Sequence, residues 1–378
     1  MAGIYVHIPY CKRKCVYCDF YSTPAMGDVE AYIDCVAREC AARREAVIGS
    51  ERVGTLYVGG GTPSLLSSGQ MHRLLDGLRR SADLSGVEEL TVEVNPDDVT
   101  DELMSCFASE GVNRVSMGVQ SFVDSELEFM GRRHNAAGAL EALGAMRRAD
   151  IGNVSIDLIY GVPGQTMQSW QRSVEQAIDT GAQHISAYSL SYEPGTRLWV
   201  MRRQGKVKET DDETCVAMYS HLAGALKAAG YEHYEISNFA KPGFRSRHNS
   251  AYWNFTPYLG LGAAAHSYDG TSRSCNPSSI KQYVAAVSER GTAAVAEQLQ
   301  QWEHYDEEVM LRLRTSDGLD ASRLERKFGA EAARQFRHKA QRHIAQGLLQ
   351  CQADTYSLTE SGIMMADAVI RDLMWDQD

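Results

Sequence analysis

The 378-residue sequence contains no run of about 18 apolar residues, which excludes a membrane-spanning helix of ordinary length. Positive charge is scarce: 38 Lys and Arg stand against 49 Asp and Glu, and the formal net charge is -11. This balance argues against nucleic acid or an anionic membrane as a partner, because both attract basic proteins. The amino terminus also lacks a charged segment followed by a cleavable apolar stretch. We therefore expect a cytoplasmic protein with no nucleic-acid partner and no transmembrane segment.

Cysteine pairs that would suggest disulfides are also missing. Six of the nine cysteines are scattered singly through helical or mixed segments, namely Cys35, Cys40, Cys106, Cys215, Cys275 and Cys351. In a reducing compartment such residues behave as small apolar side chains or free thiols. Their spacing indicates no role for any of them.

The other three cysteines, Cys11, Cys15 and Cys18, form a C-x3-C-x2-C loop directly after an apolar strand. Three thiolates can hold three corners of a cubane [4Fe-4S] cluster, which leaves one iron without a protein ligand. A structural zinc site would need four ligands, and a C-x2-C redox pair would not need Cys11. The loop therefore predicts an iron-sulfur cluster with one open position.

Apolar strands then alternate with helical segments. After the strand that precedes the cysteines, we expect strands at 55–58, 90–94, 114–118, 154–160 and 184–190, with helices between them. This alternation is typical of parallel β/α units. We predict an α/β fold with a partial six-unit parallel β/α barrel over residues 1–230.

Polar residues fall at or just beyond the ends of separate strands. They are Cys11, the run Gly59-Gly60-Gly61, Glu93, Gln120 and Asp157. In β/α barrels the carboxyl ends of the strands surround one mouth, so we expect these residues to meet there. Two plainer interpretations stay open: the acids pair with arginines in the barrel wall, and the glycines form a tight turn, because they lack the ending of a phosphate-binding P-loop.

The cysteine loop resembles that of the radical S-adenosylmethionine (SAM) superfamily, whose signature is C-x3-C-x2-C after the first strand of a partial barrel. The resemblance implies that SAM binds the open iron. It also implies that one electron, supplied by an electron donor, cleaves SAM to a 5'-deoxyadenosyl radical.

Further stretches are similar to the oxygen-independent coproporphyrinogen III oxidase branch and its haem-chaperone relatives. They cover essentially the whole chain: residues 5–9, 11–18, 59–63, 92–96, 118–122, 132–134, 156–163 and 259–262. The resemblance implies that the SAM site is lined by Tyr5, Gly60, Gly61, Thr62, Glu93, Gln120, Arg132 and Asp157. Within it, Thr62 would lie near the methionine amino group and Arg132 near the carboxylate.

Two departures favour the chaperone branch over the oxidases. Phe20 stands where the oxidases carry a fourth cysteine, and only a short segment precedes Cys11, where the oxidases have a substrate-holding extension. A third feature agrees with them. Residues 231–268 have a loop-like, aromatic composition and contain His248-Asn-Ser-Ala-Tyr252-Trp253, which matches the H-N-x-x-Y-W motif of the chaperones.

This motif implies a haem site within a connecting region at 231–300, with His248 as axial ligand. Imidazole is a common ligand of haem iron, and the rings of Tyr252 and Trp253 would pack on the macrocycle. Arg245 or Arg247 would pair with the propionates. The alternative is that His248 is a hydrogen-bonded surface or core histidine.

Residues 301–378 have a helical, charged composition with one short apolar piece, which predicts a small winged-helix-like domain. Residues 303–378 hold 10 Lys and Arg against 14 Asp and Glu, a net charge of 10 - 14 = -4, which argues against DNA binding. We expect this domain to cap the barrel mouth or to dock another protein.

These features favour a haem chaperone that binds a [4Fe-4S] cluster, SAM and haem and delivers haem to acceptor haemoproteins, with a homodimer as a candidate assembly. Its enzymatic status stays open. An active oxygen-independent coproporphyrinogen III oxidase is the first alternative. A radical methyl- or methylthio-transferase acting on RNA is the second, against which the acidic balance counts.

Overall fold

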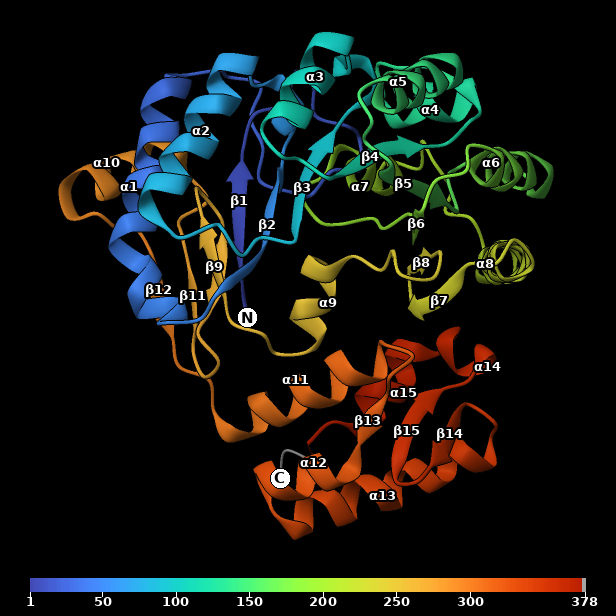
Figure 1. Ribbon diagram of the computed structural model, residues 1–378. Coiled ribbons are helices and arrows are strands. Elements are labelled where there is room, and N and C mark those ends of the chain that lie inside the picture. The colour runs from blue at the N-terminus through green and yellow to red at the C-terminus, as the bar shows by residue number, and fades with distance from the viewer. Residues whose placement is uncertain (376–378) are drawn as a thin grey trace.

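The computed structural model describes residues 1–375, whose centre is a parallel sheet with helices on its outside (Figure 1). The sheet has twelve strands in the order β12-β11-β10-β9-β1-β2-β3-β4-β5-β6-β8-β7. Its six central strands run parallel, as predicted: β1 (Ala2–Ile8), β2 (Val53–Gly60), β3 (Glu89–Val94), β4 (Arg114–Gln120), β5 (Asn153–Tyr160) and β6 (His184–Ser189).

Helices connect these strands and cover their outer face. Side-chain caps fix where several of them begin: Asp28, Ser67, Thr100 and Thr166 each accept a backbone N–H of the first turn. The helices are α1 (Val29–Ile48), α2 (Ser68–Ser81), α3 (Asp101–Ser109), α4 (Asp124–Met130), α5 (Ala136–Arg148), α6 (Met167–Asp179), α7 (Arg197–Arg203) and α8 (Asp212–Ala228), with short 3-10 turns at Pro63–Leu65 and Pro96–Asp98.

Alternation along β1 shows how the sheet divides its two faces. Ile4, Val6 and Ile8 are fully buried in the main hydrophobic core, whereas the Tyr5 ring faces inward and lies 6.1 Å from that of Tyr57 on β2. Successive strand residues point to opposite faces, so apolar residues meet the helices and polar residues line the concave inner face. We call the space that this inner face encloses the lumen.

Both edges of the sheet extend beyond the six units, and the barrel does not close. Residues 231–268, expected to be loop-like, instead form short strands and a helix, so that expectation was wrong. Strands of three or four residues are too short to show a period in the sequence. The edge elements are β7 (Glu232–Glu235), β8 (Asn238–Ala240), α9 (Arg247–Trp253), β9 (Tyr258–Leu261), β10 (His266–Tyr268), β11 (Arg273–Cys275), α10 (Ile280–Arg290) and β12 (Val295–Glu297).

The carboxyl-terminal region has its own hydrophobic core, built around Val309, Leu324 and Phe336. It combines helices, as predicted, with a three-stranded antiparallel sheet in place of the single short apolar piece. Its elements are α11 (Gln301–Leu313), β13 (Leu319–Asp320), α12 (Ala321–Phe328), α13 (Ala330–Ala345), β14 (Leu349–Gln352), β15 (Thr355–Leu358), α14 (Glu360–Ile363) and α15 (Ala366–Leu373).

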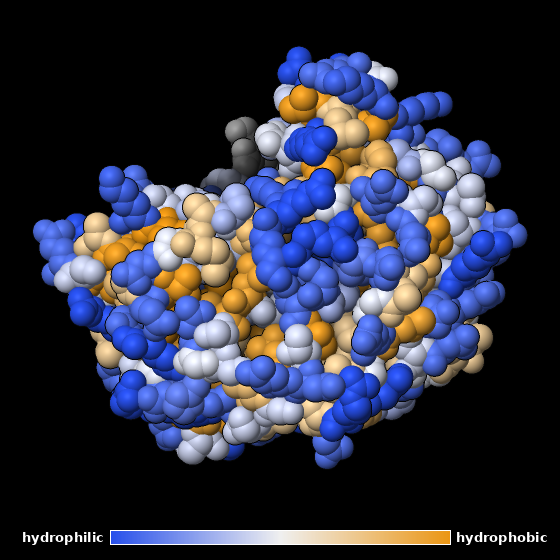
Figure 2. All heavy atoms as spheres, turned by 90° about the horizontal axis from the view of Figure 1, so that it is seen from above, coloured by the Kyte–Doolittle hydropathy of each residue, from blue (hydrophilic) through white to orange (hydrophobic). Residues whose placement is uncertain are grey.

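This domain packs beneath α9, at the amino ends of the central strands (Figure 1). The expected cap over the barrel mouth is therefore wrong, because the mouth lies at the opposite ends of the strands. Seen from the mouth end, hydrophilic residues predominate and apolar residues reach the surface between them (Figure 2). Within residues 1–375, no helix is long and apolar enough to cross a bilayer.

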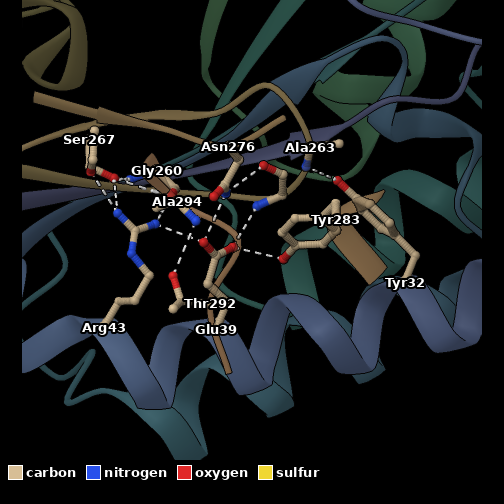
Figure 3. A network of polar contacts seen from close by, with 12 residues as sticks. Tyr32, Glu39, Arg43, Gly260, Ala263, Ser267, Asn276, Tyr283, Thr292 and Ala294 are labelled. Carbon is tan, nitrogen blue, oxygen red and sulfur yellow. Dashed lines mark hydrogen bonds and ion pairs between the residues drawn. The ribbon is translucent and has the colours of Figure 1, made fainter. Parts of the chain in front are cut away.

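A buried polar network fixes the extended edge of the sheet to α1 (Figure 3). The Glu39 carboxylate accepts hydrogen bonds from Arg43 at 2.7 Å, Asn276 at 2.8 Å, Tyr283 at 2.8 Å and the Gly262 amide at 3.0 Å. Because Glu39 is fully buried, these four donors offset the cost of removing its charge from water. The network thus holds the chain after β9 against α1.

Candidate functional site

The cysteine loop begins where β1 ends, as predicted for a site at the barrel mouth. Cys11 is buried, Cys15 and Cys18 are half-buried, and all three are free thiols. The Cys11 amide donates to Thr23 O at 3.0 Å, and the Val16 amide donates to Met130 O at 3.1 Å. These bonds fold the loop over the mouth, while Phe20 beside it is 70% exposed.

This loop fits a cubane cluster better than a single metal ion. Among residues 1–375, no three His, Cys, Asp or Glu side chains converge closely enough to hold one ion. A cubane takes each thiolate on a different iron, so its ligands do not need to converge on one point. Three free thiols on one loop, with no fourth cysteine in the signature, therefore satisfy the ligand requirement of three irons.

The glycine run at the end of β2 lies directly against the start of the cysteine loop. A Cβ added to Gly61 would lie 2.6 Å from Tyr10 O, and one added to Gly60 would lie 2.6 Å from the His7 ring. Gly60 also has a φ of 111°, which other residues rarely adopt. The tight-turn interpretation is therefore correct, and the turn is held by its own amides: Gly60 N–H donates to Glu93 and Gly61 N–H donates to Ile8 O at 2.8 Å.

Glu93 on β3 lies beneath this turn. Its carboxylate accepts hydrogen bonds from the Tyr57 hydroxyl at 2.7 Å and from the Gly60 amide at 3.0 Å. Burial raises the pKa of Glu93 to about 7, although both hydrogen bonds act in the opposite direction. Among the described residues 1–375, no arginine forms an ion pair with Glu93, so the barrel-wall pair considered for it does not form, although the charge of Arg114 acts on it.

Arg132 links the cysteine loop to two strand ends. Its guanidinium donates to Cys15 Sγ at 3.5 Å, to Asn95 Oδ1 at 2.7 Å and to Gly118 O at 2.6 Å. Asn95 in turn donates to Thr62 Oγ1 at 3.2 Å. This chain brings Thr62 and Arg132 to the same side of the mouth, and it makes Asn95 a positioning residue that carried no predicted role.

Gln120 and Asp157 complete the predicted set: Gln120 ends β4, whereas Asp157 lies within β5 (Asn153–Tyr160) rather than at its end. Gln120 has a φ of 69° at a register shift in β4, and a Cβ added to Gly118 would lie 2.7 Å from its amide nitrogen. Asp157 is half-buried, with the Ser186 and Ser116 hydroxyls beside it. Burial raises the pKa of Asp157 to about 6, while the two serine hydroxyls and nearby arginines lower it.

Tyr5 lies lower in the lumen, on β1. Its hydroxyl is hydrogen-bonded to His7 Nδ1 at 3.0 Å, and His7 Nε2 bonds to Tyr21 O at 2.9 Å. Two supporting residues, Tyr57 and His7, were missed by the sequence analysis. Alternation was the available signal, because Tyr57 lies two residues from Gly59 and His7 two from Tyr5, on the inward face of their strands.

His248 lies on α9 at the opposite end of the lumen from the mouth. It is 1% exposed, with Nδ1 hydrogen-bonded to Thr55 Oγ1 and Nε2 to the Tyr252 hydroxyl, both at 2.8 Å. Burial lowers the pKa of His248 to about 3, with Arg114 adding to the effect. Since both ring nitrogens are occupied, His248 does not fit an axial haem ligand in this arrangement. Its contacts fit the alternative of a hydrogen-bonded core histidine.

The neighbours of His248 in the motif also serve the packing of α9. The Tyr252 ring packs edge-on against Tyr258 with centroids 4.6 Å apart. The Trp253 ring is covered by the Arg314 guanidinium, 5.5 Å from its centroid. Arg245 pairs with Glu232, and Arg247 pairs with Glu88. These contacts tie α9 to the sheet and to the carboxyl-terminal domain.

Comparison with known proteins agrees with this arrangement. Residues 5–177 match the radical SAM superfamily, and residues 299–365 match the HemN C-terminal domain. The structure superposes on coproporphyrinogen III oxidase (HemN) from Escherichia coli with a TM-score of 0.84 and 24% identity, covering 99% of this chain and 90% of that one. At that identity the similarity establishes the fold.

The fold and the cysteine loop thus define a radical SAM protein, a class that implies a [4Fe-4S] cluster and SAM. The chain is 34% identical to "Heme chaperone HemW" of Lactococcus lactis, over 98% of this chain and 97% of that protein. It is 35% identical to the protein of the same name from Mycobacterium tuberculosis, over 98% and 94%. Within the superfamily, this chain belongs to the HemW family.

Proposed function

We propose that this protein is a haem chaperone, which binds haem and delivers it to acceptor haemoproteins. The observation that carries the proposal is the sequence identity to proteins named heme chaperone. It is 34 to 35% over 98% of this chain. The comparison spans the mouth, the H-N-x-x-Y-W helix and the carboxyl-terminal domain together. That extent supports a shared activity rather than a shared fold alone.

In this proposal Cys11, Cys15 and Cys18 hold the [4Fe-4S] cluster, and SAM occupies the mouth above Glu93. When bound, the cluster would supply one electron to SAM, after receiving it from an external electron donor. Arg132 supplies a cation beside the cysteine loop, and Thr62 supplies a hydroxyl on the same side of the mouth. These groups suit the carboxylate and ammonium of an amino acid, which need donors and acceptors in fixed positions.

The two half-buried acids favour a ligand that carries positive charge. Partial burial raises the pKa values of Glu93 and Asp157, and the charge of Arg114 offsets this only in part. A cationic group of the ligand placed near them would stabilise their ionised forms. SAM carries both an ammonium and a sulfonium, so it would meet this requirement.

The test uses the anaerobically reconstituted full chain. Haem is first titrated into this protein. The haem-loaded protein is then mixed with a haem-free haemoprotein such as apomyoglobin, and haem transfer is followed by absorption. Free haem at equal concentration is the control. We expect saturable binding near one haem per chain and transfer to the acceptor. A parallel assay with coproporphyrinogen III should give no protoporphyrinogen IX. Absence of saturable haem binding, or multiple turnovers of porphyrinogen, would overturn the proposal.

A further inference from the structure

The cysteine loop carries positive charge that differs from the rest of the molecule. Residues 11–20 contain Lys12, Arg13 and Lys14 against Asp19 alone, a net charge of 3 - 1 = +2. The whole chain has a formal net charge of -11, so the remainder carries -11 - 2 = -13. The loop is therefore a positive site on a strongly acidic protein.

The inner side of this loop is fixed to the barrel. Its two ends are joined, because the Cys11 amide donates to Thr23 O at 3.0 Å and the Thr23 amide donates to Pro9 O at 2.8 Å. Midway along the loop, the Leu198 amide of α7 donates to Val16 O at 2.8 Å, and the Val16 side chain is buried in a small apolar cluster with residues of α4 and α7. The loop is thus a preformed surface, and a partner would not have to order it on binding.

The outer side of the loop faces solvent. Lys12, Arg13 and Lys14 are all exposed. Lys12 forms an ion pair with the buried Asp98 at 2.5 Å, which ties the loop to the end of β3. Within residues 1–375, neither Arg13 nor Lys14 has a hydrogen-bond or ion-pair partner. Two of the three cations are therefore available to a negatively charged partner.

Phe20 adds an apolar side chain to the same loop. It is 70% exposed, and no large apolar side chain of residues 1–375 is more exposed. The next residue, Tyr21, is by contrast partly covered, and its hydroxyl accepts a hydrogen bond from the Ile280 amide at 3.0 Å. An exposed aromatic ring beside unpaired cations matches the composition of protein interfaces, which have aromatic anchors and a charged rim.

The position of this surface indicates the kind of partner. The loop carries the three cluster ligands, so a protein bound to it lies close to the cluster, and electron transfer between proteins slows steeply with distance. Nucleic acid or an anionic membrane would also be attracted by the loop, but the strongly negative remainder of the chain would repel so large an anionic surface. A small acidic protein can contact the loop alone.

We propose that Arg13, Lys14 and Phe20 form the docking surface for a small acidic protein that carries one electron, of the flavodoxin or ferredoxin kind. The inference rests on the proposed function for the need of an electron donor and adds the surface and the charge of that donor. In the complex the reduced donor loses one electron and the cluster gains it, and no covalent bond forms. Electron-transfer complexes of this kind are weak, bury less than about 1,200 Å² and depend on charge for fast association.

The first measurement is binding of the cluster-loaded full chain to oxidised flavodoxin and to oxidised ferredoxin, by calorimetry at low and high salt. The double variant Arg13→Glu/Lys14→Glu and the variant Phe20→Ser are compared with wild type. The matched control is Arg290→Glu/Arg371→Glu, which reverses two exposed charges on α10 and α15 and gives the same net charge of -11 - 4 = -15.

At low salt the loop double variant should bind the donor about tenfold more weakly than wild type or worse, and should lose most of the salt dependence. The control should stay within about twofold of wild type, because the reversed charges lie outside the loop. Phe20→Ser should weaken binding about fivefold and keep the salt dependence, because the lost contact is apolar.

The second measurement is the rate of cluster reduction, followed by electron paramagnetic resonance. Reduced flavodoxin should reduce the cluster of the loop double variant about tenfold more slowly than that of wild type. A photoreduced deazaflavin is small and needs no docking surface, so it should reduce both at the same rate. Equal rates with the deazaflavin show that the variant cluster is intact.

The outcomes separate this inference from the proposed function, because haem binding is titrated on the same samples. In a wild type that binds haem, no measurable binding of either donor would overturn this inference alone, as would equal donor affinity in the loop double variant and the control. Donor binding as expected, without saturable haem binding, would overturn the proposed function alone. A wild-type dimer that Phe20→Ser dissociates, measured by light scattering, would assign the surface to a second copy of the chain instead.

Discussion

At the mouth of the lumen, Glu93 and Asp157 are half-buried carboxylates whose pKa values are raised by burial, and hydroxyl and backbone groups donate hydrogen bonds to them. At the opposite end, His248 is more deeply buried, and both of its ring nitrogens are bonded to fixed partners from β2 and α9. Arg114, 1% exposed, affects both ends, since its charge lowers the pKa of His248 and opposes the rise at Glu93 and Asp157. The end of the lumen around His248, which we call the base, is therefore closed by fixed hydrogen bonds. The mouth, by contrast, can bind a charged ligand.

The largest effect is expected at the mouth, from replacing Cys11, Cys15 and Cys18 with serine. The triple variant should lose the cluster completely, because no other cysteine in the signature can replace three ligands. Iron analysis after anaerobic reconstitution should fall from about four irons per chain to near zero. Cys351→Ser removes an exposed cysteine of the carboxyl-terminal domain and is the control. Retention of about four irons by the triple variant would contradict the cluster assignment.

The residues of the mouth were largely predictable because they lie in the carboxyl-terminal parts of strands, and the apolar segments of the sequence indicate where those strands are. Six apolar segments separated by helices place Glu93, Gln120 and Asp157 at equivalent positions, and barrel geometry brings such positions together. Local signals therefore sufficed for residues far apart in the chain. The resemblance added Arg132 and Thr62, and the structure links them through Asn95.

The base and the sheet edge were not predictable in the same way. The burial of His248 depends on α9, a helix of seven residues whose position is set by bonds from its amides to Glu89 on β3. The four donors around Glu39 likewise include groups from beyond residue 260. Such contacts join segments more than 150 residues apart, and no local period reveals them.

The second prediction tests the base. His248→Ala should lower the free energy of unfolding by about 2 to 4 kcal/mol, because it leaves a cavity and removes a partner from both Thr55 and Tyr252. Chemical denaturation of the apo-protein measures this, with His338→Ala as the exposed control. SAM affinity should change less than stability, since His248 reaches Glu93 only through Tyr57, whose ring stacks on His248 with centroids 5.1 Å apart and whose hydroxyl donates to Glu93. A large loss of SAM binding without a loss of stability would mean that the two ends are not separate in function.

The smallest and sharpest prediction concerns Glu93→Gln at the mouth. Burial raises the folded pKa of Glu93 from 4.5 to about 7, so the folded apo-protein favours the protonated carboxyl. Its contribution to stability is therefore fully present below the unfolded pKa and is lost as pH rises from about 4.5 through about 7. Asp157, with a pKa of about 6, should add a similar slope that Glu93→Gln leaves in place.

The free energy of unfolding measured across this pH range should fall less steeply in Glu93→Gln than in wild type. SAM should act in the opposite direction, because a cationic ligand favours the ionised acid, so wild-type affinity should rise with pH through about 7. Asp269→Asn, at a surface turn, is the matched control for removing one carboxylate. Identical pH profiles for Glu93→Gln and wild type would show that Glu93 is already ionised in the apo-protein. The raised pKa of Glu93 would then no longer distinguish the mouth from the opposite end of the lumen.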